Sequence, residues 1–201
     1  MRIGMLGTGV VGQTLERKLI ELGHDVKVGS RDPSRSFADA AAHGELVFNA
    51  TTGTASLEAL RMAGAGSLAG KVLVDVANPL DTSRGFPPTL SVANTDSLAE
   101  QIQREFPEAR VVKALNTMNA DVMVDPGLVP GDHNAFIAGD DDDAKDDVRS
   151  LLESFGWPPT RVLELGELAA ARGMEMYLPL WLRLFRVMGT ARINIGVTRE
   201  T

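Results

Sequence analysis

With 201 residues and a formal net charge of −7, the chain is long enough for one domain with a substantial core. This acidic balance argues against general binding to nucleic acids or anionic membranes, and the absence of cysteine excludes disulfides, thiolate metal sites and cysteine catalysis. No apolar run approaches the roughly 20 residues of a membrane-spanning helix, and a strand pattern begins at Met1. We therefore expect no signal peptide, a cytoplasmic location and no membrane partner.

The first informative stretch joins a strand pattern to a helix pattern through a glycine loop. An apolar run over residues 1–6 precedes Gly7, Gly9 and Gly12, spaced G-x-G-x-x-G, and the following helical pattern ends at Gly23. Gly7 permits a sharp turn, Gly9 lets a pyrophosphate approach the backbone, and Gly12 lets helix and strand pack closely. A glycine motif alone is weak evidence, but this context is the required one. We predict that the loop binds a dinucleotide through Gly7, Thr8, Gly9, Val10, Val11 and Gly12.

The end of the second strand pattern, Val26 to Val28, indicates which dinucleotide. NAD-binding proteins usually carry an acid there for the ribose hydroxyl groups. This chain instead has Ser30 and Arg31, with Arg35 close behind. A hydroxyl and two guanidinium groups suit a 2′-phosphate, because arginine binds phosphate through paired N–H donors. We predict NADP(H) rather than NAD(H); Asp32 is the residue that argues against this choice.

Strand and helix patterns alternate along the rest of the chain. Apolar runs predict strands at 45–50, 71–76, 110–115, 134–138 and 161–165, and helical patterns occupy 37–42, 57–62, 96–105 and 139 to about 155. Residues 81–90 and 121–132 read as loops. The predicted fold is α/β: a Rossmann-like, doubly wound, mostly parallel sheet with a C-terminal strand and helix extension. We expect residues 1–120 to form the NADP-binding core. Residues 121–201 should complete the sheet and cover the cleft, within one compact unit.

Ligands of such folds bind at the carboxyl ends of the strands. Those ends carry small hydroxyl and amide side chains, with no convergent histidine, aspartate or glutamate. We therefore predict no catalytic side chain and a cleft that leaves the chemistry to its cofactor. Its predicted binding residues, beyond those of the glycine loop, are Ser30, Arg31, Arg35, Ala50, Thr51, Thr52, Asn78, Pro79 and Asn116.

Two further segments attract attention. The acidic run Asp140 to Asp143 is typical of a helix start, where carboxylates favour the positive end of the dipole, so we predict no metal site. Residues 177–188 are strongly apolar, and Pro179 should kink a helix there. This segment either packs on its own sheet or pairs with a second subunit in a homodimer while covering the nicotinamide pocket.

Taken together, these motifs resemble the F420H2:NADP+ oxidoreductase family. The resemblance rests on MRIGMLGTGVVG, GHDVKVGSRDP, VVKALNT, FIAGDD and LGELAAARGMEMYLPLWLRL. It implies hydride transfer between NADP(H) and the deazaflavin F420, with both bound in one cleft. It also implies that Ser30, Arg31 and Arg35 hold the 2′-phosphate and that Thr8 contacts the cofactor. The anionic tail of F420 would need a local basic patch, for which the candidates are Arg84, Arg172, Arg183 and Arg186.

Two alternatives remain open from the sequence. An NADPH-dependent reductase of a small carbonyl or imine compound would need a proton donor in the cleft. Lys113 and His133 are the candidates, although a structural role is expected for each. The other alternative is a non-catalytic NADP(H)-binding module.

Overall fold

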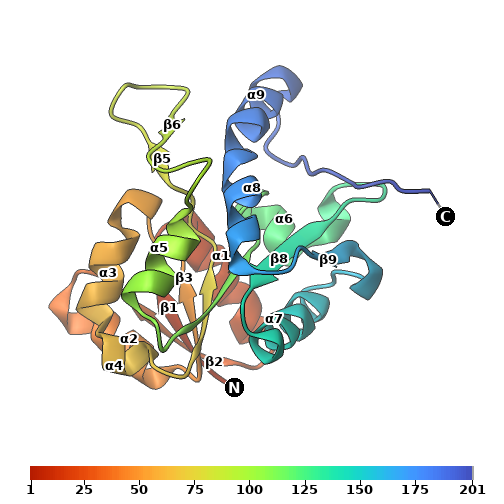
Figure 1. Cartoon of the computed structure of the whole chain (residues 1–201). Coiled ribbons are helices and arrows are strands. Elements are labelled where there is room, and N and C mark those ends of the chain that lie inside the picture. Colours follow the sequence, from red (N-terminus) through yellow and green to blue (C-terminus); the bar gives the residue numbers. More distant parts are fainter. Residues whose placement is uncertain (201) are drawn as a thin grey trace.

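The computed structural model describes residues 1–200 and shows one twisted sheet between two layers of helices (Figure 1). The main sheet contains β1 (Arg2–Leu6), β2 (Asp25–Gly29), β3 (Leu46–Asn49), β4 (Val72–Asp75), β7 (Arg110–Ala114), β8 (Ala135–Gly139) and β9 (Val162–Glu164). The strand order is β2-β1-β3-β4-β7-β8-β9, and every pair is parallel except β7 with β8. The predicted Rossmann-like, mostly parallel α/β fold is therefore confirmed.

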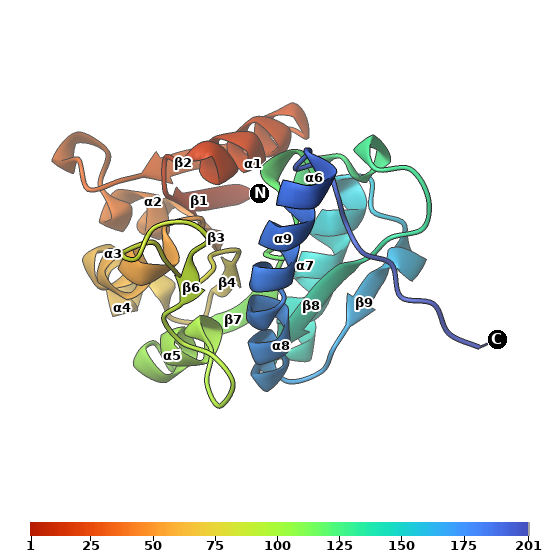
Figure 2. The ribbon, with the colours of Figure 1, turned by 90° about the horizontal axis from the view of Figure 1, so that it is seen from above.

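The helices are α1 (Val10–Glu21), α2 (Phe37–His43), α3 (Ser56–Ala63), α4 (Ala65–Leu68), α5 (Leu98–Glu105), α6 (Ala120–Val124), α7 (Asp142–Ser154), α8 (Ala171–Met176) and α9 (Leu178–Met188). One core cluster joins the sheet to α1, α6 and α7, and a second joins its other face to α2, α3 and α5. Figure 2, which looks down on the sheet, shows these two layers on either side of it. Because strand order reverses between β1 and β3, a crevice is expected at their carboxyl ends.

The structure differs from the sequence predictions at three points. Residues 121–132 are not a plain loop: the Asn119 side chain caps α6, which buries Val122 and Met123. Within the predicted loop 81–90, Leu80 pairs with Leu90 in a short antiparallel ribbon of β5 (Leu80–Asp81) and β6 (Thr89–Leu90).

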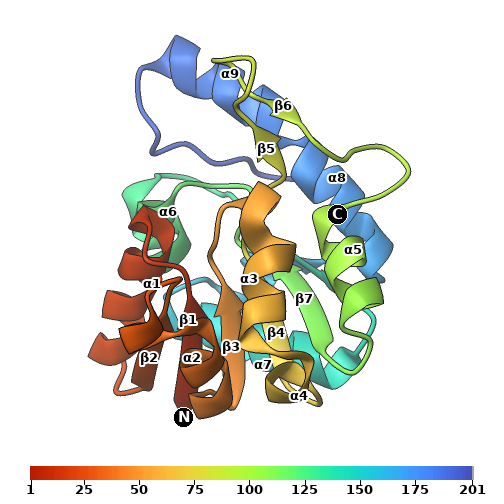
Figure 3. The same cartoon turned by 90° about the vertical axis from the view of Figure 1, so that its left-hand side faces the viewer.

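The third difference concerns the C-terminal helical region. Pro179 does not kink one long helix; it lies in the first turn of α9, where its missing N–H costs nothing. Tyr177 separates α8 from α9. Figure 3 shows the pair rising from the body, with α9 standing above the carboxyl ends of the strands.

The acidic run at the start of α7 has the predicted helix-starting role. Asp141 accepts a hydrogen bond from the backbone N–H of Ala144 at 2.8 Å, and Asp142 and Asp143 lie in the first turn. Asp140 accepts a bond from the N–H of Leu168. Within residues 1–200 no helix is both long and apolar enough to cross a bilayer. The division of the chain into a core of residues 1–120 and an extension of residues 121–201 stays a prediction. The last residue of that extension, Thr201, lies outside the described residues.

Asp96 gives the fold a measurable pH dependence. Two nitrogens of the Arg104 guanidinium lie 2.9 and 2.7 Å from the carboxylate oxygens of Asp96. This pairing lowers the pKa of Asp96 to about 2. Because the folded-state pKa lies below the ordinary value of 3.8, this stabilisation is present above pH 3.8 and lost as the pH falls towards 2. We expect Asp96→Asn to lower the free energy of unfolding at pH 7 by about 1 kcal/mol, since Arg104 is solvent-exposed. Urea titrations should show this deficit shrinking between pH 4 and pH 2; a constant deficit would contradict it.

Candidate functional site

The glycine loop has the geometry that a phosphate-binding turn needs. Gly7 has a φ of +121°, and a Cβ there would lie 2.5 Å from the Ala50 carbonyl oxygen. A Cβ on Gly12 would lie 2.4 Å from the carbonyl oxygen of Gly7, whereas a Cβ on Gly9 would meet nothing within 4 Å. Gly9 is the N-cap of α1, and no side chain among residues 1–200 caps that end of the helix. The loop therefore presents free N–H groups and open space to an anion.

Two alanine substitutions distinguish these glycine roles. Gly9 has extended backbone angles that alanine adopts freely, so Gly9→Ala should leave the melting temperature unchanged. The new methyl group would nevertheless fill the space for the pyrophosphate, and we expect NADPH binding to weaken about tenfold or more, which is about 1.4 kcal/mol. Gly12→Ala should instead destabilise the fold by about 1–3 kcal/mol through its backbone clash. Calorimetric titration and thermal melts of both variants test this contrast; equal melting temperatures would refute it.

An arginine-lined cavity of about 370 Å³ opens beside the glycine loop. Its walls are Gly7, Thr8, Gly9, Ser30, Arg31, Asp32, Arg35, Phe37, Ala50, Thr51 and Thr52. The 30–36 turn is closed by a backbone bond from Ser30 N to Arg35 O at 2.8 Å, which brings both arginines to one wall. Within residues 1–200, neither Arg31 nor Arg35 forms an ion pair with a carboxylate. Their guanidinium groups are thus available for an external anion.

Asp32 lines the same cavity, but its carboxylate is engaged locally. Its Oδ1 accepts bonds from the backbone N–H and the hydroxyl of Ser34, both at 2.9 Å. These bonds, the backbone one foremost, hold the pKa of Asp32 below its ordinary value. The residue caps a turn of 3₁₀ helix over Pro33–Arg35. Its place in the sequence suggested a ribose ligand, whereas the structure gives it a role in shaping the arginine turn.

A second, amide-lined cavity of about 230 Å³ adjoins the first, and Ala50, Thr51 and Thr52 line both. Its remaining walls are Val11, Gly53, Val76, Ala77, Asn78, Leu80, Asn116, Met118, Met123, Leu178 and Trp181. Asn116 donates to Asn78 Oδ1 at 2.9 Å, and Asn78 donates to the Asn116 carbonyl at 2.8 Å. The buried Oδ1 of Asn116 has no partner within the described chain. Apolar walls with a few fixed polar groups are typical of a small-molecule site.

Leu115 helps to set the position of Asn116. Its φ of +61° is a left-handed conformation that a branched side chain adopts only under constraint, at a cost of about 1–3 kcal/mol. This turn at the end of β7 brings the next residue back towards Asn78. The strain is thus located at the cavity.

A buried ionic cluster adjoins the amide-lined cavity through Ala77, and the sequence patterns did not predict it. Lys113 is completely buried, and its Nζ donates to Asp75 at 2.7 Å and to Glu175 at 2.8 Å. Burial works against the charge of Lys113, but the two carboxylates outweigh it and raise its pKa. The sequence did carry a signal for this cluster, since Lys113 and Asp75 each interrupt an otherwise apolar strand run. Charged side chains in such runs are buried only when they are paired.

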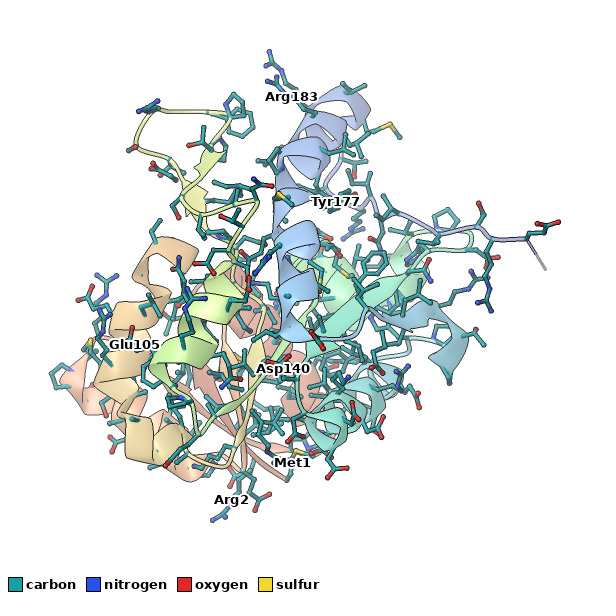
Figure 4. The ribbon with its side chains drawn as sticks, in the orientation of Figure 1. Met1, Arg2, Glu105, Asp140, Tyr177 and Arg183 are labelled. Carbon is teal, nitrogen blue, oxygen red and sulfur yellow. The ribbon has the colours of Figure 1, made fainter. Side chains whose placement is uncertain are left out.

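Several residues singled out from the sequence lie outside both cavities. Gly12 and Pro79 serve packing and turn roles, and Val10 is exposed at the start of α1. Arg172 is paired with Glu100, and Arg183 and Arg186 are exposed on α9, while Arg84 is exposed in the β5–β6 loop. Figure 4 shows Arg183 at the outer part of α9, pointing away from the body. His133 lines a separate cavity, where its Nε2 lies 3.0 and 3.1 Å from two backbone carbonyl oxygens.

The open helix N-terminus and the arginine turn define a dinucleotide-binding protein of the Rossmann class. A family model described as "NADP oxidoreductase coenzyme F420-dependent" matches residues 2–38. F420-dependent NADP reductase of Methanothermobacter marburgensis is 31% identical over 209 residues, which cover 92% of each chain. The chain therefore belongs to the family of F420-dependent NADP reductases, as the sequence motifs predicted.

Further comparisons give one crystal structure of similar name, one relative of another name and one protein that shares the fold. A crystal structure from Arthrobacter sp. FB24, named provisionally as an F420-dependent NADP reductase, has 51% identity and a TM-score of 0.96, covering 99% of this chain and all of that one. Rat metalloreductase STEAP3 is 32% identical over 90% of this chain, which spans 38% of that protein's length. An imine reductase from Streptomyces aurantiacus has 19% identity and a TM-score of 0.64 over 94% of this chain and 63% of that one, so it shares the fold.

Proposed function

We propose that the protein transfers hydride between NADP(H) and coenzyme F420. The observation that carries this proposal is that the two cavities adjoin and share Ala50, Thr51 and Thr52 in their walls. One cavity offers cationic groups suited to a phosphate, and the other offers a largely apolar space suited to planar rings. A nicotinamide that reaches from the first into the second would meet an acceptor there.

The proposed pose of NADP(H) follows from the groups at each strand end. The pyrophosphate lies against the N-terminus of α1 at Gly9, and Ser30, Arg31 and Arg35 hold the 2′-phosphate with charge-assisted hydrogen bonds. The nicotinamide lies beside Asn78 and Asn116, in the amide-lined cavity. Thr8, Val11, Ala50, Thr51 and Thr52 complete the proposed contacts.

In the proposed reaction, NADPH, oxidised F420 and one proton give NADP+ and reduced F420, and the reverse reaction balances in the same way. The chain's contribution is to bind, orient and exclude water. Leu178 and Trp181 provide the wall opposite the strand ends, so the acceptor ring would lie between α9 and the nicotinamide.

The positions of the candidate proton donors favour F420 over a carbonyl or imine substrate. Lys113 is sealed beneath the cavity by Asp75, Glu175 and the Ala77 carbonyl. His133 lies in another cavity. Neither can reach a substrate in the cleft, and a deazaflavin needs no such donor for the hydride step.

The test is to mix the protein with NADPH and oxidised F420, and with NADP+ and reduced F420, while following deazaflavin absorbance. We expect turnover in both directions, and much slower turnover with NADH. Tight NADPH binding without transfer to F420 would favour the non-catalytic module. Transfer to carbonyl or imine compounds but not to F420 would favour the small-substrate reductase.

We also propose that the protein is a homodimer, because Leu180, Val187 and Met188 of α9 are 56%, 82% and 62% exposed. A second copy is the occupant that would cover them. Sedimentation velocity should give a dimer that Val187→Glu dissociates; a monomeric wild-type protein would refute this. A cytoplasmic location also remains a prediction.

A further inference from the structure

A continuous chain of hydrogen bonds connects the cofactor cleft to helix α8. The Thr51 hydroxyl, in the wall of both cavities, donates to Asn49 Oδ1 at 2.7 Å, and Asn49 Nδ2 donates to Asp75 Oδ1 at 2.8 Å. Asp75 Oδ2 accepts from Lys113, and Lys113 in turn reaches Glu175 of α8. Asn49, Asp75 and Lys113 have no exposed surface, and Glu175 has 1%.

The far end of this chain is anchored on α5. Glu175 Oε2 accepts from the backbone N–H of Leu98 at 2.8 Å, and Oε1 accepts from the N–H of Ala99 at 3.2 Å. The carboxylate therefore lies at the positive end of a helix dipole, which compensates for the second negative charge of the cluster. Burial raises the pKa of Glu175 in spite of these donors.

A buried ionic cluster of this kind adds little net stability to a fold. Desolvation of buried charges offsets much of their attraction, and apolar residues of similar volume often serve as well. Hydrogen-bonded charges do fix the relative position of the groups that they join, since each bond favours one distance and angle. The cluster thus restricts where α8 can lie relative to the ends of β4 and β7.

The position of α8 decides the position of the acceptor wall. Glu175 precedes Leu178 by less than one helical turn, and Leu178 and Trp181 form the side of the amide-lined cavity opposite the strand ends. Leu178 is the residue of α9 that is buried in the body, and the outer part of the helix is exposed. Figure 4 shows Tyr177 at the junction of α8 and α9, above the sheet. Within the chain, the arm formed by residues 171–188 is therefore joined to the body at its lower end by this cluster. Beyond its outer end, Arg192 and Val197 join the following segment to Asp121 and Asn134.

We propose that Glu175, held by Lys113 and Asp75, is a positioning residue that sets the separation between the nicotinamide and the acceptor. This inference rests on the proposed function for its kinetic consequence. The strand ends hold the nucleotide and the arm forms the wall against the acceptor. The buried cluster connects the strand ends to the arm. Neither Glu175 nor Lys113 touches a reactant.

The kinetic test compares Glu175→Gln with Glu100→Gln. Glutamine keeps the size and the accepting oxygen of Glu175 but weakens its bond to Lys113. We expect the single-turnover rate of hydride transfer to fall by about 10- to 100-fold, because small misplacements of reacting atoms are costly. The dissociation constant of NADPH should stay within about twofold of wild type, a change below about 0.4 kcal/mol. Glu100→Gln removes the more exposed contact between α5 and α8, which is the ion pair of Glu100 with Arg172. This variant should leave the rate unchanged.

A distance measurement tests the arm without any acceptor. Since the chain has no cysteine, spin labels at Met62→Cys on α3 and Arg186→Cys on α9, in labelled protein diluted with an excess of unlabelled protein, report the arm within one chain. We expect one narrow distance distribution in the otherwise wild-type protein and a broader or displaced one with Glu175→Gln. If Glu175→Gln fails to fold, Glu175→Asp, which is too short to reach both Lys113 and α5, takes its place.

The outcomes separate the two proposals. A broadened distance distribution without any transfer to F420 in the wild type would refute the proposed function and support the positioning role. An unchanged distribution together with an unchanged rate would overturn the positioning role, as would a loss of stability with normal kinetics of the folded enzyme.

Discussion

Replacing Arg31 by alanine should raise the dissociation constant of NADPH about 10- to 100-fold, corresponding to the loss of a charged hydrogen bond of about 1.5–3 kcal/mol. The dissociation constant of NADH should change by less than about twofold, or about 0.4 kcal/mol, since NADH has no 2′-phosphate. The reason lies in the turn over residues 30–36, which directs Arg31 and Arg35 into the cavity beside the glycine loop. Calorimetric titration of both nucleotides measures the difference.

The matched control is Arg84→Ala, which removes an exposed arginine from the β5–β6 loop, away from the arginine-lined cavity. It should leave the binding of both nucleotides unchanged. The Arg31 effect should also diminish at high salt, because the guanidinium group is exposed and its field is screened. Equal losses of NADPH and NADH affinity in Arg31→Ala would show that Arg31 does not read the 2′-phosphate.

Replacing Lys113 by methionine should be among the most destabilising single substitutions in the chain, at about 3–5 kcal/mol. Methionine has a similar volume, so the loss does not come from a cavity. It comes from leaving Asp75 and Glu175 buried beside each other without a cation. In the variant these carboxyl groups avoid repulsion by binding protons, which raises their folded-state pKa values above the unfolded ones. Stability from that protonation is present at low pH and lost as the pH rises, so the deficit should grow from pH 5 to pH 8.

Two further variants isolate the charge effect, which denaturant titration can measure. Lys71→Met removes a half-buried lysine that donates to the Ala41 carbonyl, and it should cost no more than about 1.5 kcal/mol. The triple variant Asp75→Asn, Lys113→Met, Glu175→Gln removes every charge of the cluster and should recover much of the lost stability. If Lys113→Met were no more destabilising than Lys71→Met, the buried ion cluster would not exist in solution.

The local patterns were enough to predict the sheet and the nucleotide-binding loop. Apolar runs marked the strands that are buried on both faces, and the spacing of Gly7, Gly9 and Gly12 depends on backbone geometry within a few residues. The arginine turn is equally local, because Ser30 and Arg35 close it through one backbone bond. Asp32 was harder to interpret, since its preference for Ser34 over a ligand depends on the turn that both residues form.

The sequence by itself therefore determined a dinucleotide-binding α/β fold and the cationic residues beside its glycine loop, because each depends on neighbours in the chain. Only the tertiary structure decided that Lys113 meets Asp75 and Glu175, and that Leu178 and Trp181 face the strand ends. Those residues come from distant segments, and their meeting depends on how β4, β7 and α8 pack. A charged residue in a buried strand indicates that it has a partner, but only the packing of the elements determines which residue that partner is.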